Sequence, residues 1–261
     1  MYHPVVSRDE WIAARKQLLI KEKELTRLRD RLNAERRALP WVKIEKQYVF
    51  DGPHGRETLA DLFAGRSQLI VKHFMFGPEW KEGCVGCSFE VDHAEAALVH
   101  LEHHDVSYVV VSRAPFAEIE AFRKRMGWRL KWVSSYGSDF NYDFHVSFKE
   151  EEIARGEAYY NYDIHKIPID ELSGRSVFYK DETGDIFHTY SAYARGGEMF
   201  LGTYHFLDIT PKGRNETING NLTDWVRHHD RYDAGGTVAP TGRYVADADA
   251  ESCCATPNAE E

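Results

Sequence analysis

The first forty residues follow a helical pattern of apolar and charged positions. Ser7 and Glu10 have the spacing of a capping box, in which each side chain bonds the backbone N–H of the other residue. A helix is therefore predicted from Ser7 to Pro40. Lys21 and Glu35 interrupt its apolar seam, which favours a helix lying across the domain over one that pairs with its copy in a homodimer. The apolar stripe recurs at helical spacing at Trp11, Ala14, Leu18, Leu25, Leu28 and Leu32.

Between residues 41 and 134 the pattern alternates between strands and helices. The run 67–76 is apolar on both faces, which is typical of a fully buried strand. From Cys84 the period becomes helical, with apolar residues at Cys87, Val91, Ala94, Leu98 and Leu101. Alternating strands and helices imply parallel strands joined by right-handed crossovers. The predicted strands are 41–50, 67–76, 106–112 and 130–134, and the predicted helices are 58–63, 84–101 and 115–126.

The second half of the chain has a weaker pattern. Residues 176–180 and 186–193 are predicted to form a hairpin, residues 199–207 a helix or a strand, and residues 222–232 a last helix. The predicted fold is α/β: a central mixed sheet flanked by helices, with an added long N-terminal helix. The predicted organisation is a helical extension (1–40), one domain (41–233) and a disordered acidic tail (234–261).

Composition and charge narrow the function classes. The chain has 261 residues, of which 43% are hydrophobic, so a sizeable core can form. Its net charge of -9 argues against a nucleic-acid groove or an anionic membrane surface, both of which require a basic face. No apolar run is long enough to cross a bilayer, and residues 1–7 lack the pattern of a secretory signal. We therefore expect a cytoplasmic protein.

The cysteines carry the candidate chemistry. Cys84 and Cys87 form a C-x-x-C, and Cys253 and Cys254 are adjacent near the end of the chain. In a reducing compartment a C-x-x-C indicates redox chemistry or a metal site. A helix start lowers the pKa of a cysteine, so Cys84 is predicted to be a nucleophile that attacks a disulfide. Cys87 lies one turn later on the same face and is predicted to resolve the mixed disulfide.

Other interpretations of these residues remain open. Cys84 and Cys87 are also compatible with two small core residues, or with a zinc site that includes two of four nearby histidines: His73, His93, His103 and His104. No second ligand pair has the usual finger spacing, so no metal and no cofactor is predicted. Trp80 and Lys81 flank the dithiol loop and either contact a partner or are solvated. Cys253 and Cys254 either relay electrons to the C-x-x-C or are incidental.

Five blocks of the sequence carry a family resemblance. They are residues 7–41, residues 69–88 (LIVKHFMFGPEWKEGCVGCS), residues 111–135, residues 137–144 (GSDFNYDF) and residues 187–196 (FHTYSAYARG). These blocks resemble a bacterial family of thioredoxin-like proteins that is classified as a domain of unknown function, and the resemblance extends over nearly the whole chain up to about Tyr232. The family is predicted to contain dithiol–disulfide oxidoreductases, so the resemblance implies a thioredoxin-like fold and that activity.

The chain departs from better-known thioredoxin-like sequences at several positions. Thioredoxins have Trp before the first Cys and Gly-Pro between the pair, whereas this chain has Gly83 and Val85-Gly86, and it has no proline near residues 174–176. Residues 174–178 resemble the peroxiredoxin strand that brings an arginine, here Arg175, to the reactive thiolate. Lys81 replaces the threonine that those enzymes use.

The sequence therefore predicts thiol–disulfide exchange, with a protein or small-molecule disulfide or thiol as substrate. The alternatives are a thiol peroxidase that uses Cys84 and a non-enzymatic module that binds a metal or a partner.

Overall fold

The computed structural model describes residues 3–216 and 225–246. The chain divides into two compact units, Met1–Trp41 and Val42–Glu261. The first unit is the helix α1 (Arg8–Arg37), in which the predicted capping box is present. The Ser7 hydroxyl accepts from the N–H of Glu10 at 3.3 Å, and the Ser7 N–H donates to the Glu10 carboxylate at 2.9 Å. No side chain of α1 is buried. Pairing of this helix in a homodimer stays a prediction.

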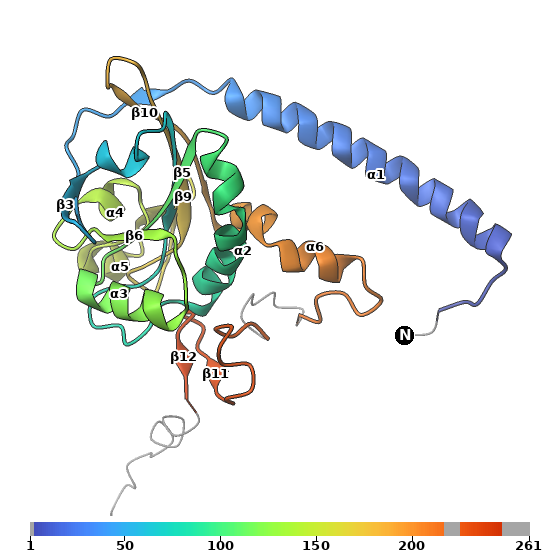
Figure 1. Cartoon of the computed structure of the whole chain (residues 1–261). Helices are drawn as coiled ribbons and strands as arrows, with labels where there is room; N and C mark the ends of the chain where they lie inside the picture. Colours follow the sequence, from blue (N-terminus) through green and yellow to red (C-terminus); the bar gives the residue numbers. More distant parts are fainter. Residues whose placement is uncertain (1–2, 217–224, 247–261) are drawn as a thin grey trace, which may run out of the picture. The chain divides into compact units, whose positions relative to one another are not determined.

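The second unit is built on a mixed sheet. In the part of the chain that the structure describes, this sheet has eight strands in the order β1-β10-β9-β4-β5-β6-β2-β3. The strands β4, β5 and β6 are parallel, and β9 and β10 form an antiparallel hairpin beside β4 (Figure 1). The predicted α/β class with a central mixed sheet is confirmed. The strands are β1 (Val42–Lys43), β2 (Val49–Gly52), β3 (Gly55–Thr58), β4 (Gln68–His73), β5 (Val106–Ser112), β6 (Lys131–Ser134), β9 (Gly174–Lys180) and β10 (Ile186–Tyr193).

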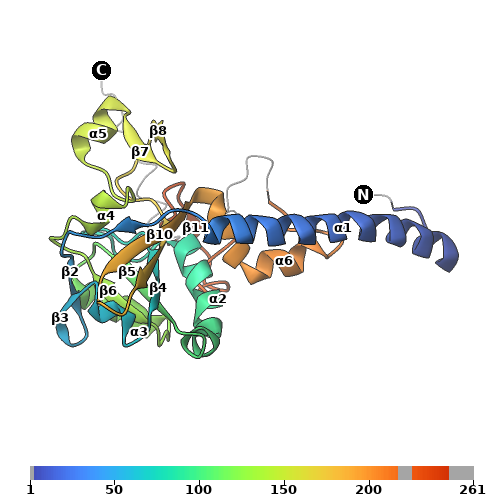
Figure 2. The same ribbon diagram turned by 90° about the horizontal axis from the view of Figure 1, so that it is seen from above.

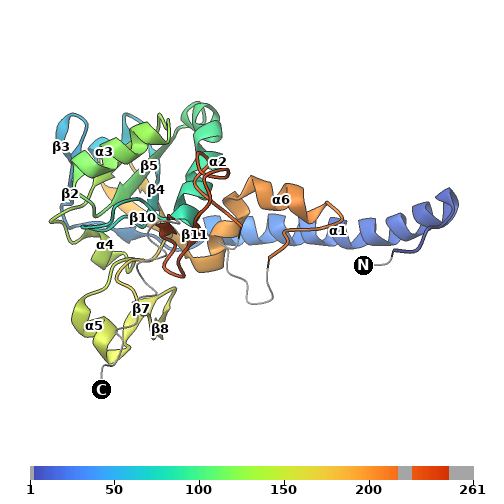
Figure 3. The ribbon, with the colours of Figure 1, turned by 90° about the horizontal axis from the view of Figure 1, so that it is seen from below.

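Helices flank this sheet, and two small hairpins are attached to it. Figures 2 and 3 show α6 beside α2, and α5 with β7 and β8 projecting from one side of the unit. The helices are α2 (Val85–Glu102), α3 (Phe116–Arg125), α4 (Phe140–Asp143), α5 (Glu150–Arg155) and α6 (Gly202–Asp208), with 3-10 turns at Asp61–Phe63 and Ala194–Phe200. The hairpins are β7 (Ala158–Tyr160) with β8 (Asp163–His165), and β11 (Thr237–Val238) with β12 (Tyr244–Val245).

The alternation of side chains along the strands produces a separate core on each face of the sheet. On β5, Val109 and Val111 pack on one face with Phe140 of α4, whereas Val110 packs on the other face. That second face is covered by α2 and α3, whose Val91 and Ile119 lie in the same cluster as Val110. The two faces therefore differ in their covering elements.

Three parts of the structure differ from the sequence prediction. The predicted strand 41–50 is two strands in different parts of the sheet. β1 is an edge strand that pairs with β10, whereas β2 lies near the other edge between β3 and β6. The charged residues between β1 and β2 break the apolar alternation, and one of them, Lys46, bonds Asp139 and Asp143 instead of joining a ladder. The predicted helix 58–63 is a 3-10 turn after β3.

The predicted last helix, 222–232, is wrong over its described residues, since 225–232 form turns and irregular structure. The region beyond Ala234 also differs from the prediction. Over residues 237–245 it forms the hairpin β11–β12, because Val238 and Tyr244 pack beside Val85 and Phe89 of α2. The remainder of the predicted tail lies outside the described residues.

Candidate functional site

The C-x-x-C lies between β4 and α2, at the carboxyl ends of the parallel strands, where open α/β sheets form their ligand sites. Cys84 is the N-cap of α2. Its N–H donates to the Met75 carbonyl at 3.0 Å, and its carbonyl accepts from the N–H and the hydroxyl of Ser88, each at 2.9 Å. A Cβ atom on Gly83 would lie 2.6 Å from the ring of Phe74. The departure from thioredoxin sequences at Gly83 thus has a packing reason.

Three buried charged side chains lie on the same face of the sheet as the dithiol. Lys72 on β4 and Arg175 on β9 are cross-strand neighbours, and Glu90 of α2 lies one turn after Cys87. The Lys72 ammonium donates to Glu90 Oε2 at 2.8 Å, and Arg175 Nε donates to Glu90 Oε1 at 2.7 Å. The exposed fractions are 0% for Lys72, 4% for Glu90 and 6% for Arg175. Burial and the charge of Arg175 lower the pKa of Lys72 to about 7. While Lys72 is protonated, two cations share one carboxylate and positive charge is in excess beside the sulfurs.

This environment shifts the pKa values of the two thiols in opposite directions. A hydrogen bond to Cys87 raises the pKa of Cys84, and burial raises it further. Burial also acts to raise the pKa of Cys87. The hydrogen bond from Cys84, the charge of Lys72, a backbone hydrogen bond from Met75 and the charge of Arg175 oppose it and lower this pKa to about 6. The pair therefore ionises readily as a unit, with the negative charge on Cys87.

The predicted net lowering of the Cys84 pKa is wrong, because the hydrogen bond to the Cys87 side chain and burial outweigh the backbone N–H of Cys87, which lies in the first turn of α2 and does act to lower this pKa. The first N–H of the helix, that of Val85, does not donate to the Cys84 sulfur. It donates to the carbonyl of Gly242 at 2.8 Å. The attacking and resolving roles assigned to Cys84 and Cys87 remain predictions.

A cavity of about 310 Å³ opens onto the dithiol. Its size is at the lower end of the range for small-molecule sites. Both cysteines line it together with the three buried charges, and most of its remaining wall is apolar. The apolar lining residues include Met75, Phe89, Ile169, Leu172, Leu201 and Pro240. The cavity thus combines the cysteine pair with walls suited to an apolar ligand.

The C-terminal segment is attached to the dithiol loop by several side chains. The ring of His228 donates to the Gly83 carbonyl at 2.9 Å, and burial lowers the pKa of His228 to about 4, so this ring is neutral at pH 7. Glu82 pairs with Arg125 and with Arg231. Arg243, in the β11–β12 hairpin, lies over the ring of Trp80 at 4.0 Å. The loop and the segment therefore form one structural unit.

The other predicted site residues have different positions. Trp80 is only 5% exposed and packs in the core, so it is not a solvated loop residue, whereas Lys81 is exposed. His73 packs against the rings of Phe140 and Phe144 on the opposite face of the sheet, and burial lowers its pKa to about 3. Cys253 and Cys254 lie outside the described residues. Within residues 3–216 and 225–246, no three His, Cys, Asp or Glu side chains gather closely enough to hold a metal ion.

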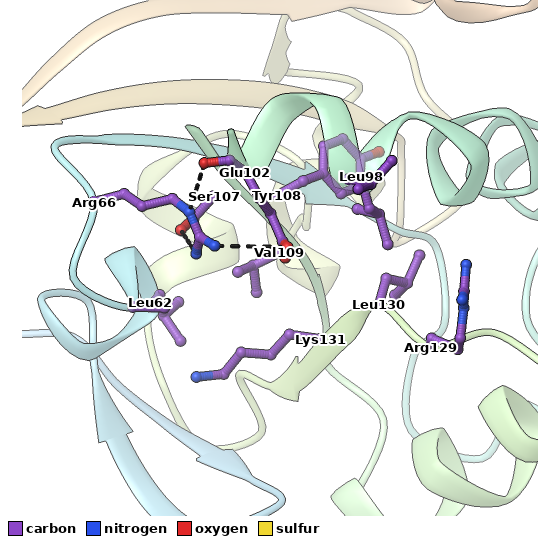
Figure 4. Close-up of a pocket in the computed structure, with 12 residues that line it drawn as sticks. Leu62, Arg66, Leu98, Glu102, Ser107, Tyr108, Val109, Arg129, Leu130 and Lys131 are labelled. Atoms are coloured by element: carbon purple, nitrogen blue, oxygen red, sulfur yellow. Dashed lines mark hydrogen bonds and ion pairs between the residues drawn. The ribbon is translucent and has the colours of Figure 1, made fainter. Parts of the chain in front are cut away.

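A second cavity, of about 360 Å³, lies at the other end of β5 (Figure 4). Its cations already have partners. Arg66 bonds Glu102 and Ser107, Arg129 bonds Glu95, and Lys131 pairs with Glu57, which lies outside the lining. This cavity is therefore less suited than the dithiol cavity to hold a ligand.

Sequence reasoning missed Lys72 and Glu90. Both residues carried a signal, because each is a charged residue within an apolar run: Lys72 between Val71 and Phe74, and Glu90 next to Val91 in the apolar stripe of α2. A charged residue at a buried position requires a partner nearby. The pattern did not show that the two residues partner each other.

The fold and the site define the class of protein. Parallel β4 and β5 are joined through α2, an antiparallel hairpin lies beside β4, and a C-x-x-C begins the joining helix. This is a thioredoxin-like arrangement. No helix of the described residues is long and apolar enough to span a membrane.

The chain belongs to the family described as "Bacterial protein of unknown function (DUF899)", whose family model matches residues 1–232. The predicted resemblance is thereby confirmed. No curated protein matches the sequence.

Among solved structures, PrxQ of Xylella fastidiosa is 15% identical, with a TM-score of 0.39, 61% of this chain covered and 88% of that chain. Peroxidoxin BcpB of Mycobacterium tuberculosis is 12% identical, with a TM-score of 0.42, and the match covers 63% of this chain and 95% of that chain. A candidate protein disulfide isomerase of Bacteroides thetaiotaomicron is 13% identical, with a TM-score of 0.37, and the match covers 64% of this chain and 91% of that chain. The assignment of the class rests on the strand order and connections of the chain itself.

Proposed function

We propose that this protein is a thiol–disulfide oxidoreductase that acts through Cys84 and Cys87. The observation that carries the proposal is the hydrogen-bonded thiol pair, which ionises readily beside Lys72 and Arg175 and lines a cavity. A thiolate is the form that attacks a disulfide. Buried cations that hold one sulfur ionised are what this chemistry requires.

In the proposed reaction Cys84, which is the N-cap of α2 and the more exposed of the two cysteines at 5% against 3%, attacks first. Cys87, whose sulfur bonds the backbone of Met75 beside the buried charges, is the resolving thiol. As Cys84 bonds one sulfur of the substrate, its proton passes along the hydrogen bond to Cys87, and the other substrate sulfur leaves as a thiolate. Cys87 then loses its proton and attacks Cys84, which releases the second thiolate. The substrate gains two electrons and leaves as two thiolates, which take up one proton released by the pair and one from solvent, and the pair becomes a disulfide.

Redox titration tests the proposal. The protein is equilibrated in a dithiothreitol redox series, its free thiols are alkylated and its mass is measured. We expect Cys84 and Cys87 to be lost together at one potential, and Cys84→Ser or Cys87→Ser to abolish this transition. A pair that stays reduced throughout the series contradicts the proposal.

Trapping of the mixed disulfide tests the order of attack. The Cys87→Ser variant should accumulate the substrate on Cys84, and accumulation on Cys87 in Cys84→Ser would reverse the roles. The matched control replaces both Cys253 and Cys254 by Ser. If this control also changes the transition, these two residues take part as the proposed relay.

One observation favours thiol peroxidase activity as a second candidate. Arg175 Nη1 is buried and has no hydrogen-bond partner among the described residues, so it can donate to a hydroperoxide oxygen. The thiolate would take the terminal oxygen, giving a sulfenic acid and an alcohol, and the second thiol would then form the disulfide and release water. Hydrogen peroxide consumption that is lost in Cys84→Ser and in Arg175→Met would support this candidate. Consumption equal to that of a chain without both cysteines would reject it.

A further inference from the structure

The dithiol is covered by a part of the chain that lies beyond the family match, which ends at residue 232. The cover is the turn of the hairpin β11–β12. Gly242 accepts from the Val85 N–H, and a Cβ atom at this glycine would lie 2.7 Å from the Cys84 sulfur. Gly242 also has a φ of +82°, a conformation that favours glycine. The turn is therefore shaped to lie directly on the sulfur.

Independent contacts hold this hairpin in place. Two backbone hydrogen bonds of 2.8 Å close its turn, from Ala239 to Arg243 and from Gly242 to Ala239. The Tyr244 hydroxyl donates to Gly235 at 3.0 Å, and Arg231 lies over the Tyr244 ring at 4.4 Å. These contacts make the hairpin a fixed part of the cavity wall.

The hairpin restricts what can reach the sulfurs. Cys84 is 5% exposed and Cys87 is 3% exposed, so a disulfide within a folded protein cannot approach them along the surface. A molecule that enters a cavity of about 310 Å³ must be small. Because a disulfide reacts only when a thiolate contacts one of its sulfurs, access decides which disulfides are substrates.

The charges of the cavity also restrict the ligand. Lys72 and Arg175 are paired with Glu90, and Glu198 is paired with Arg195 and Arg214. While Lys72 is protonated, the two cations exceed the Glu90 carboxylate by one charge, and the thiolate on Cys87 balances that charge. The wall is otherwise largely apolar. An uncharged ligand fits this lining. The buried Arg175 Nη1 can donate to a single acceptor, so a ligand with several carboxylates would lose the hydration of the others without gaining partners.

We propose that the substrate is a small, uncharged disulfide, or the corresponding thiol in the reverse direction, and that the hairpin β11–β12 excludes disulfides of proteins and of charged peptides. This inference rests on the proposed thiol–disulfide exchange. It adds a specificity-determining element that the C-x-x-C motif does not contain.

The test measures one turnover of the prereduced full chain, so that no electron donor is needed. The chain is mixed with excess 2-hydroxyethyl disulfide, glutathione disulfide or insulin, and formation of the Cys84–Cys87 disulfide is followed by quenching and mass measurement. We expect 2-hydroxyethyl disulfide to react at least about tenfold faster than the other two. Equal or faster reaction of insulin or glutathione disulfide overturns the inference.

Two truncated chains test the role of the hairpin. A chain that ends at Gly236 lacks it, and the matched control ends at Ala246 and retains it. We expect insulin to react at least about tenfold faster with the shorter chain, with little change for 2-hydroxyethyl disulfide. An unchanged ratio of the two rates overturns the proposal.

If the shorter chain does not fold, the variant Arg243→Ala in the full chain replaces the truncation, because it removes the contact of the hairpin with Trp80. The rate with insulin relative to that with 2-hydroxyethyl disulfide should then rise as in the truncated chain. An unchanged ratio of these rates again overturns the proposal. Failure of the proposed function has a different signature. In that case the pair does not form a disulfide in the dithiothreitol series, whichever substrate is used.

Discussion

The two faces of the sheet are made by the same strands but have different chemistry. On the α4 face, Phe50, Phe140 and Phe178 pack in one cluster, and a neutral, buried His73 lies against Phe140. On the α2 face, the core contains the dithiol and, beside it, the group Lys72, Glu90 and Arg175.

Buried charge is costly, and apolar side chains of similar volume often stabilise a fold as well or better. The α4 face therefore has the composition expected from stability alone. The α2 face retains charges whose main consequence is the ionisation of the thiol pair. The comparison separates the part of the core that stabilises the fold from the part that would carry the proposed thiol–disulfide exchange.

The largest expected effect is on the α4 face. Phe140→Ala removes a fully buried ring and should lower the free energy of unfolding by about 3–5 kcal/mol, measured by urea denaturation. The ultraviolet absorbance of the thiolate should not change, because the ring lies on the other face from the sulfurs. A shift in the thiolate titration would show that the two faces are coupled.

A somewhat smaller loss is expected on the α2 face. Glu90→Gln leaves Lys72 and Arg175 without their shared carboxylate and should cost roughly 3 kcal/mol, with a further fall in the pKa of Cys87. Glu57→Gln is the matched control, since Glu57 is also buried but pairs with the partly exposed Lys131 at the edge of the sheet. The control should cost less and leave the thiolate unchanged. If both variants shift the thiolate titration equally, the group Lys72, Glu90 and Arg175 has no specific effect on the dithiol.

The smallest perturbation is a change of pH, which alters only protons. Thiolate absorbance of the reduced chain should persist as the pH falls from 9 and should disappear near pH 6, and Cys87→Ser should lose this titration. The pKa of Cys87 is lowered by folding, so its contribution to stability is present above its unfolded pKa and is lost as the pH falls through about 6.

The contribution of Cys84 to stability changes with pH in the opposite direction. Folding raises its pKa, so its contribution is lost as the pH rises above the value for an ordinary thiol. A first titration that disappears in Cys84→Ser and persists in Cys87→Ser would contradict this assignment of the charge.

Much of the fold could be predicted from local patterns. Residues 106–112 form the predicted strand β5, Ser7 caps α1, and the helical period from Cys84 becomes α2. Each of these depends on neighbours within a few residues, which a periodic pattern contains. The segment 41–50 was not predicted correctly, because the partners of its two strands lie in different parts of the sheet.

The site shows the same division. The sequence alone determined that two cysteines lie one turn apart at the start of a helix, because motif and period are local. The tertiary structure alone decided which sulfur carries the charge and what covers it. Lys72, Arg175 and Gly242 come from three elements remote in sequence, and they meet the dithiol only because strand order and packing bring them there. The electrostatics and access of a buried group depend on such distant neighbours, which a local pattern does not contain.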